Sequence, residues 1–254
     1  MTARLARTVS SAALVLLTAA CTNYYEIPIE TPIRPKLDVS AFQRVLVAGF
    51  VSGGTEDVDA NLETTRLLRS QLRTKSELRV IDTDVLPLMD VANESNSQGS
   101  GGSSATSTQA PIKDEKDLEP YERVFANVEY WKKVGEEYQQ PLIVTGTVMF
   151  TPHQRNSIVQ REEEVYDSFG RRRVVPVRTY MERKGYILRP KFIFIDGRSG
   201  TVMHSENFRE EILYNANQTT PALSSYFELM DRLIPSFLST LSSQKIKGTR
   251  ILLQ

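Results

Sequence analysis

Cys21 is the one cysteine of this 254-residue chain, and it lies where a bacterial lipid anchor would be attached. Two arginines precede an apolar run at residues 12–17, which leads into the small residues 18–20. A positive segment, an apolar segment and a small-residue junction are typical of a secretory signal. The apolar run is much shorter than the about 20 residues that a membrane-spanning helix needs. We therefore predict a lipoprotein signal peptide at 1–20 and a Cys21 thiol that becomes a thioether to diacylglycerol.

Two other interpretations of Cys21 are an unmodified thiol after ordinary signal cleavage and a buried apolar cysteine. Lipidation is favoured because an unpaired thiol in an exported protein is a reactive liability, which acylation removes. The segment resembles the lipobox of bacterial lipoproteins, although Thr18 stands where leucine is usual. Thr22 rather than aspartate follows the cysteine. In these lipoproteins an aspartate at this position usually retains the protein in the inner membrane. Its absence implies sorting to the outer membrane, facing the periplasm.

Three glycines could in principle hold a phosphate group. Gly49, Gly53 and Gly54 follow an apolar segment and precede a predicted helix, which is where nucleotide-binding folds hold phosphate. Their spacing matches neither the dinucleotide fingerprint nor a P-loop. The carboxylates of Glu56 and Asp57 would also repel a phosphate at that helix end. We therefore interpret this segment as an ordinary loop and expect no cofactor.

The histidines and strand-end aspartates form no recognisable catalytic pattern. His153 ends one predicted strand and His204 lies within another, and both are expected at the surface or at a strand edge. A Ser–His–Asp hydrolase needs a serine on a strained turn, and the chain has no Gly-X-Ser-X-Gly segment. Asp82 has no base beside it in the sequence and is interpreted as a strand-end cap. Two histidines and one thiol are a poor ligand set for zinc or a redox metal. We predict that the protein is not an enzyme.

The charge balance argues against nucleic acid as a partner. The full chain carries 31 basic and 31 acidic residues. Loss of Arg4 and Arg7 with the signal peptide would reduce the basic residues to 29, against 31 acidic ones. Such a chain has no net positive footprint for nucleic acid and no strong attraction to anionic lipid.

Apolar segments and amphipathic helices alternate along the chain, which predicts an α/β fold. We expect a mixed β-sheet with helices packed on it, a Rossmann-like three-layer variant, in one domain at 41–254. Residues 21–40, with three prolines, are expected to form a lipidated extended tether. Strands are expected at 44–50, 78–82, 141–150, 186–196, 201–213 and 249–253, and helices at 59–74, 118–138 and 221–242. In the last helix the expected core positions are Leu223, Phe227, Met230, Ile234, Phe237 and Leu241.

Two segments depart from this alternation. Residues from about 92 to 117 are centred on a Ser/Gly/Asn/Gln/Thr-rich stretch and are expected to be a disordered insertion. Residues from about 157 to 183 are strongly charged and contain a turn signal, so they are expected to form one long exposed β-hairpin. The acidic residues Glu162, Glu163 and Glu164 and the basic residues Arg171, Arg172 and Arg173 would form cross-strand charge pairs on it. The hairpin is either a solvated ribbon or a docking surface for a partner.

The order of these segments resembles a family of envelope lipoproteins. The segments that carry the resemblance are Val47–Phe50, Leu78–Asp82, Leu142–Val148, Phe192–Val202 and the long C-terminal helix. They are similar to the fold shared by the curli secretion lipoprotein (CsgG type), the lipoprotein activators of penicillin-binding proteins, and the N-terminal domain of the Tol–Pal β-propeller protein. The resemblance covers roughly residues 42–241. It implies a fold much more than a function, because its motifs are apolar strands with glycines.

One departure bears on function. The curli channel inserts hairpins as membrane strands, whereas here several charges would face lipid in either register, each costing up to about 2–4 kcal/mol. We therefore predict a non-catalytic, lipid-anchored periplasmic adaptor or assembly factor that binds another envelope protein. The alternatives are a subunit of a curli-type secretion channel, in keeping with a possible homo-oligomer, and an activator of a peptidoglycan synthase. A hydrolase that uses Asp82 or His204 is a more distant alternative.

Overall fold

The computed structural model describes residues 24–99, 112–166, 168–215, 217–218 and 220–253. Within them the chain forms two compact units, Lys36–Ser242 and the terminal segments on either side of it. Cys21 and the predicted signal peptide lie outside the described residues. The larger unit contains the sheet and all the described helices.

The terminal unit is a two-stranded antiparallel ribbon. Strand β1 (Tyr24–Ile33) pairs with β8 (Gln244–Leu253) along its whole length, from Tyr24 opposite Leu253 to Ile33 opposite Gln244. Within the expected extended tether at 21–40, residues 24–33 thus form one strand of this ribbon, and the strand expected at 249–253 is the end of the other. Both segments are extended, as the sequence indicates, but their pairing joins opposite ends of the chain and has no local signal.

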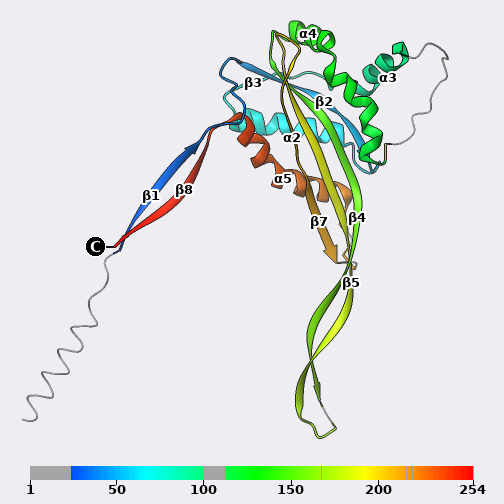
Figure 1. Ribbon diagram of the computed structural model, residues 1–254, viewed down its shortest axis with the longest axis vertical. Coiled ribbons are helices and arrows are strands. Elements are labelled where there is room, and N and C mark those ends of the chain that lie inside the picture. Colours follow the sequence, from blue (N-terminus) through cyan, green and yellow to red (C-terminus); the bar gives the residue numbers. More distant parts are fainter. Residues whose placement is uncertain (1–23, 100–111, 167, 216, 219, 254) are drawn as a thin grey trace, which may run out of the picture. The chain divides into compact units, whose positions relative to one another are not determined.

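The larger unit is built on a mixed sheet with the strand order β3-β2-β4-β5-β6, and β7 also pairs with β5 (Figure 1). β2 runs parallel to β3 and β4, whereas β5 is antiparallel to β4, β6 and β7. The strands are β2 (Arg44–Gly54), β3 (Arg79–Val80), β4 (Leu142–Tyr166), β5 (Arg172–Asp196), β6 (Val202–Asn207) and β7 (Glu210–Asn215). The expected strand at 201–213 is thus two strands, both paired with β5.

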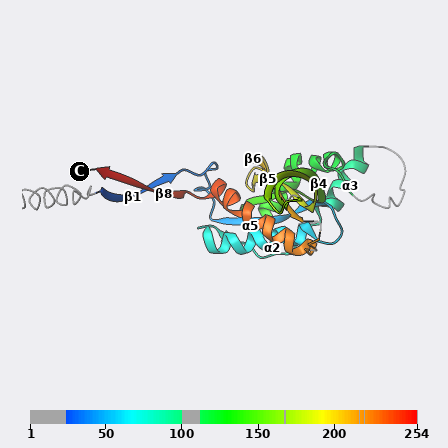
Figure 2. The ribbon, with the colours of Figure 1, turned by 90° about the horizontal axis from the view of Figure 1, so that it is seen from below.

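Helices cover both faces of this sheet, which confirms the predicted three-layer α/β fold (Figure 2). The central strands place successive side chains in two buried clusters, one on each face of the sheet. They are continuous apolar runs, as expected of a sheet that is covered on both faces. On one face lie α2 (Ala60–Lys75) and α5 (Ala222–Leu241). On the other face lie α3 (Leu88–Gly99), the 3₁₀ helix η1 (Glu115–Ala126) and α4 (Val128–Glu137).

Local signals set the ends of the helices. Asp59 caps α2 as predicted, because its carboxylate accepts a hydrogen bond of 3.0 Å from the Leu62 backbone N–H. The helix expected at 118–138 is instead interrupted at Asn127, whose side chain accepts a bond of 3.1 Å from the Tyr130 N–H and starts α4. The Asn127 cap therefore divides one predicted helix into two elements, although the apolar spacing continues across it.

The expected disordered insertion at about 92–117 is too long at both ends. Helix α3 continues to Gly99, and Ile112 is buried where its backbone oxygen accepts a 2.8 Å bond from the Gly54 N–H. Glu115 already belongs to η1. Residues 100–111 lie outside the described residues. Tertiary contacts, which composition does not reveal, order the flanks of this polar segment.

Two leucines of α5 test how this helix packs on the sheet. Leu233 is 1% exposed in the cluster between α2, α5 and the sheet, whereas Leu223, which periodicity places in the core, is 43% exposed. We expect Leu233→Ala to lower the free energy of unfolding by about 2–5 kcal/mol, since it leaves a cavity. Leu223→Ala on the same helix is the matched control and should cost less than about 0.5 kcal/mol. Urea unfolding measures both, and equal losses would contradict the packing.

Candidate binding surface: the β4–β5 hairpin and its base

Strands β4 and β5 pair without a register shift from Leu142 opposite Asp196 to Tyr166 opposite Arg172. Only the first part of this ladder belongs to the body of the sheet. β2 pairs with β4 as far as Phe150, and β7 pairs with β5 only from Arg183 onward. Beyond these points the two strands continue alone as an exposed ribbon, which confirms the predicted long hairpin (Figure 1).

The charged residues of the hairpin form one of the predicted cross-strand charge pairs, but not between directly opposite residues. Glu162, Glu163 and Glu164 lie directly opposite Pro176, Val175 and Val174, not opposite arginines. Within the described part of the hairpin, the ion pair between these two sets is the diagonal one from Arg172 to Glu164, at 2.5 Å. The hairpin is centred at Phe169, five residues after Glu164 but two before Arg171, so the arginines lie nearer the tip than the glutamates. An exposed ion pair of this kind contributes at most about 1 kcal/mol.

Large apolar side chains are exposed along the hairpin. Ile158 and Tyr180 lie directly opposite each other and are 72% and 64% exposed. At the tip Phe169 is 80% exposed, with the guanidinium carbon of Arg171 5.3 Å from its ring centroid. Aromatic residues and arginine are the residue types enriched where proteins bind one another.

Two arginines that the sequence analysis did not single out share one face of the hairpin. Arg155 lies directly opposite Arg183, and both side chains are exposed. Like charges at directly opposite positions destabilise a strand pair. Among the described residues, no acidic side chain lies within ion-pair distance of either arginine. Only the strand register brings these residues together, so the sequence held no signal for the pair.

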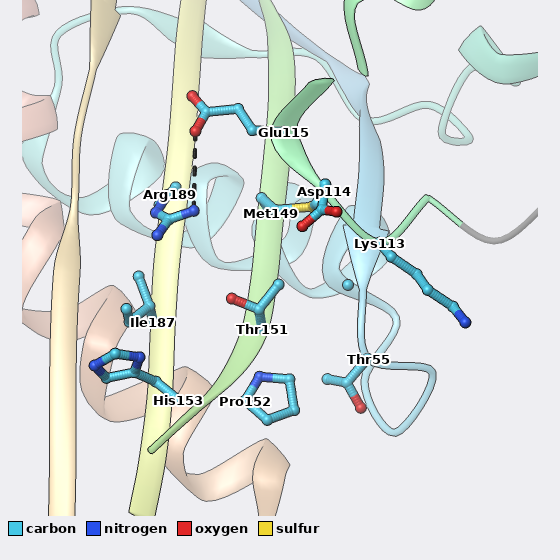
Figure 3. Close-up of a pocket in the computed structure, with 11 residues that line it drawn as sticks. Thr55, Lys113, Asp114, Glu115, Met149, Thr151, Pro152, His153, Ile187 and Arg189 are labelled. Carbon is cyan, nitrogen blue, oxygen red and sulfur yellow. Dashed lines mark ion pairs between the residues drawn. The ribbon is translucent and has the colours of Figure 1, made fainter. Parts of the chain in front are cut away.

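A cavity of about 570 Å³ lies where the hairpin leaves the sheet (Figure 3). Met149 and Ile187 provide apolar lining, and Arg189 forms a long ion pair of 3.8 Å with Glu115 of η1. Figure 3 shows the Lys113 side chain pointing away from the other lining residues. This cavity is open and mixed in polarity, and it adjoins the start of the exposed ribbon at Thr151 and Pro152.

The residues considered for chemistry are dispersed in the structure. His153 Nε2 lies 3.3 Å from Glu211 of β7, and Asp82 forms an ion pair with Arg73 of α2. No group of three potential metal ligands occurs among the described residues. Gly54 is part of β2 rather than a loop, at a φ of 107°, and a side chain there would collide with the backbone oxygen of Phe150. Close strand packing therefore accounts for this glycine.

His204 belongs to a small polar cluster around Glu206 of β6. The Glu206 carboxylate forms an ion pair with Lys36, accepts a 3.0 Å bond from the Thr240 hydroxyl, and lies 3.5 Å from His204 Nε2. Partial burial alone would raise the pKa of Glu206, but the hydrogen bonds from Lys36, Thr240 and His204 outweigh it and lower the pKa. The cluster holds the first residues of the larger unit against the end of α5, where the Leu37 N–H also donates to the Thr240 carbonyl.

Comparisons with known proteins give distant matches only. No protein-family model matches the chain, and no curated protein matches it. Its structure is similar to that of lipoprotein GNA1162 from Neisseria meningitidis, at 12% identity and a TM-score of 0.33, over 77% of this chain and 97% of that one. It is also similar to a putative neuraminyllactose-binding hemagglutinin homolog from Helicobacter pylori, at 12% identity and a TM-score of 0.32, over 84% and 90% of the two chains.

A third match is a PDZ domain protein from Parabacteroides distasonis, at 9% identity and a TM-score of 0.17, over 93% of this chain and 41% of that one. Likenesses this distant carry no argument about function, and the resemblance to the curli and activator lipoproteins stays a prediction. No described helix has the length and apolar character needed to cross a membrane.

The Glu206 cluster predicts a pH dependence of stability. Because its pKa is lower in the folded state, Glu206 stabilises the fold above the unfolded pKa of about 4.3, and this contribution is lost as pH falls toward the folded pKa. Glu206→Gln should therefore be destabilising at pH 6 and much less so at pH 3, as measured by urea unfolding. Glu136→Gln on the exposed side of α4 is the matched control. A pH-independent effect of Glu206→Gln would contradict the assignment.

Proposed function

We propose that this chain is a lipid-anchored protein of the bacterial cell envelope that binds another envelope protein through its β4–β5 hairpin, as an adaptor or assembly factor. The observation that carries the proposal is the ribbon itself, which extends beyond the sheet from Thr151 and Glu182 to its tip. It exposes apolar and arginine side chains that make no contribution to the core. That it acts without catalysis stays a prediction from the sequence.

The charge pattern favours a ribbon that works in water. Side chains alternate between the two faces of the hairpin, and Arg161 and Glu163 lie on one face while Glu162 and Glu164 lie on the other. Each face therefore carries ionised groups, together with exposed apolar ones. A surface that mixes arginine, aromatic and aliphatic side chains suits a protein partner.

The proposed anchor at Cys21 lies close in the chain to one end of the terminal ribbon. Tyr24 pairs with Leu253, so the two ends of the described chain lie at the same end of this ribbon. Tyr24 follows Cys21 by three positions in the sequence, and three residue steps span at most about 11 Å. With Cys21 acylated, this end of the ribbon, including the C-terminal strand, would lie close to the membrane surface.

The anchor is tested by Cys21→Ser. We expect the variant to move from the membrane fraction to the soluble fraction, with an unchanged melting temperature, because the larger unit begins only at Lys36. Fractionation followed by mass spectrometry of the N-terminal peptide measures both the release and the missing acyl groups. A variant that stays with the membrane after an alkaline wash would contradict a purely lipid attachment.

The role of the hairpin is tested by shortening it. Replacing residues 154–184 with Asn–Gly joins the His153–Gly185 pair, whose backbone groups point toward each other, through a two-residue turn suited to a hairpin. We expect this chain to keep its thermal stability, since the core lies below the cut, and to lose the envelope protein that cross-links to the full-length chain in cells. A second variant replaces Arg171, Arg172 and Arg173 with Gln at unchanged hairpin length, and shows whether these arginines take part in binding. An unchanged cross-linked partner in the shortened chain would refute the proposed role.

A further inference from the structure

We propose that the free edge of β4, from His153 to Arg161, binds an extended polypeptide segment in which acidic and apolar side chains alternate. The segment would add to the sheet as one more strand. This inference rests on the proposed function, because it names the part of the hairpin that binds and the chemistry of the partner.

The direction of the backbone groups along β4 follows from two hydrogen bonds at the base of the hairpin. The Phe150 carbonyl accepts a 2.9 Å bond from Thr55, on the β2 side, and the Pro190 carbonyl accepts one of 2.9 Å from Phe208, on the far side of β5. Even-numbered residues of both strands therefore point their backbone groups away from the partner strand. The ladder has no register shift, so the residues that present a free N–H and C=O at the β4 edge are Gln154, Asn156, Ile158 and Gln160.

The two edges of the hairpin are not equivalent. On β5, Pro176 occupies an outward-facing position and has no N–H to offer an added strand. Prolines on edge strands are a common way to prevent unwanted pairing. On β4, Pro152 precedes the free stretch, and no proline occurs between His153 and Tyr166. One edge is thus interrupted and the other left open.

An added strand would also continue an existing one. β2 pairs with β4 up to the position of Gly54 beside Phe150, and the chain then leaves the sheet at Thr55. A strand beside His153–Arg161 would therefore occupy the same place in the sheet as β2, further along β4. The 570 Å³ cavity, which Thr55, Thr151 and Pro152 help to line, adjoins its beginning (Figure 3).

The arginines on the odd-numbered face determine the charge of the partner. Arg155 faces Arg183, and Arg161 lies further along the same face. A carboxylate on a strand paired with β4 would lie about 4.5–5.5 Å, Cβ to Cβ, from the arginine opposite it. It would relieve the repulsion between the like charges and accept charge-assisted hydrogen bonds. Glu163 follows on this face and would repel an acidic partner, so the favourable stretch ends at Arg161.

The even-numbered face of the hairpin determines where the partner segment would carry apolar side chains. Ile158 and Tyr180 form an exposed apolar pair there, flanked on β4 by the uncharged Asn156 and Gln160. Apolar side chains on an added strand would cover Ile158 and remove it from water. Because side chains alternate along a strand, one segment can present carboxylates to the arginines and apolar groups to Ile158 only if the two types alternate.

The test uses the full-length acylated chain in detergent and a short fluorescent peptide in which Glu and Val alternate, with a peptide of alternating Lys and Val for comparison. Gln160→Pro removes an outward-pointing N–H without breaking a β4–β5 hydrogen bond. Val174→Pro does the same on the edge that Pro176 already interrupts, and is the matched control. Fluorescence anisotropy measures the dissociation constants, and melting temperatures confirm that both variants fold.

We expect the Glu peptide to bind, Gln160→Pro to weaken binding at least about tenfold, and Val174→Pro to leave it unchanged. Arg155→Glu should weaken binding of the Glu peptide and strengthen binding of the Lys peptide. The inference is overturned by no binding of the Glu peptide at about 1 mM, by equal binding of the two peptides, or by equal effects of the two prolines. It is also overturned if the chain is oligomeric by native mass and Gln160→Pro makes it monomeric, because a second copy then occupies the edge. None of these results refutes the proposed function, which fails only if the shortened hairpin keeps its partner.

Discussion

The uninterrupted pairing of β4 with β5 is the constraint on which the rest of the larger unit depends. Its inner half lies between two helical layers, where Phe192 and Phe194 pack against Phe237 of α5. Its outer half has no layer over it. A two-stranded ribbon is only marginally stable in water by itself. Here the buried half holds the register for the exposed half, because a one-residue slip would turn the core side chains of the whole strand to the wrong face.

This coupling gives the hairpin surface a definite pattern. The same register that buries Phe192 places Arg155 opposite Arg183 and Ile158 opposite Tyr180. A flexible loop of the same composition would not hold these side chains in fixed pairs, nor would it display backbone N–H and C=O groups along a straight edge. The core thus determines the register of the proposed binding surface, although the exposed half of the hairpin lies outside the core.

Much of the fold could be predicted because it depends on local patterns. The continuous apolar run of β2 indicates a strand covered on both faces, and Asp59 caps α2 through a bond to a residue of the next turn. Periodicity succeeds for Met230 and Phe237 but fails for Leu223, which lies in the first turn of α5 and is 43% exposed. The spacing of apolar residues alone indicates which face of a helix is buried. It does not indicate how much of that face the neighbouring layer covers.

The sequence by itself determined the α/β class and the exposed hairpin, and it predicts lipidation at Cys21, because each depends on residues close together in the chain. Only the tertiary structure decided that residues 24–33 pair with the C-terminal strand, that Glu162–Glu164 lie opposite residues 174–176 rather than Arg171–Arg173, and that Arg155 lies opposite Arg183. These pairings join residues far apart in the chain, or depend on where a turn is centred. In the hairpin the register is selected by packing of the core rather than by the residues that come into contact.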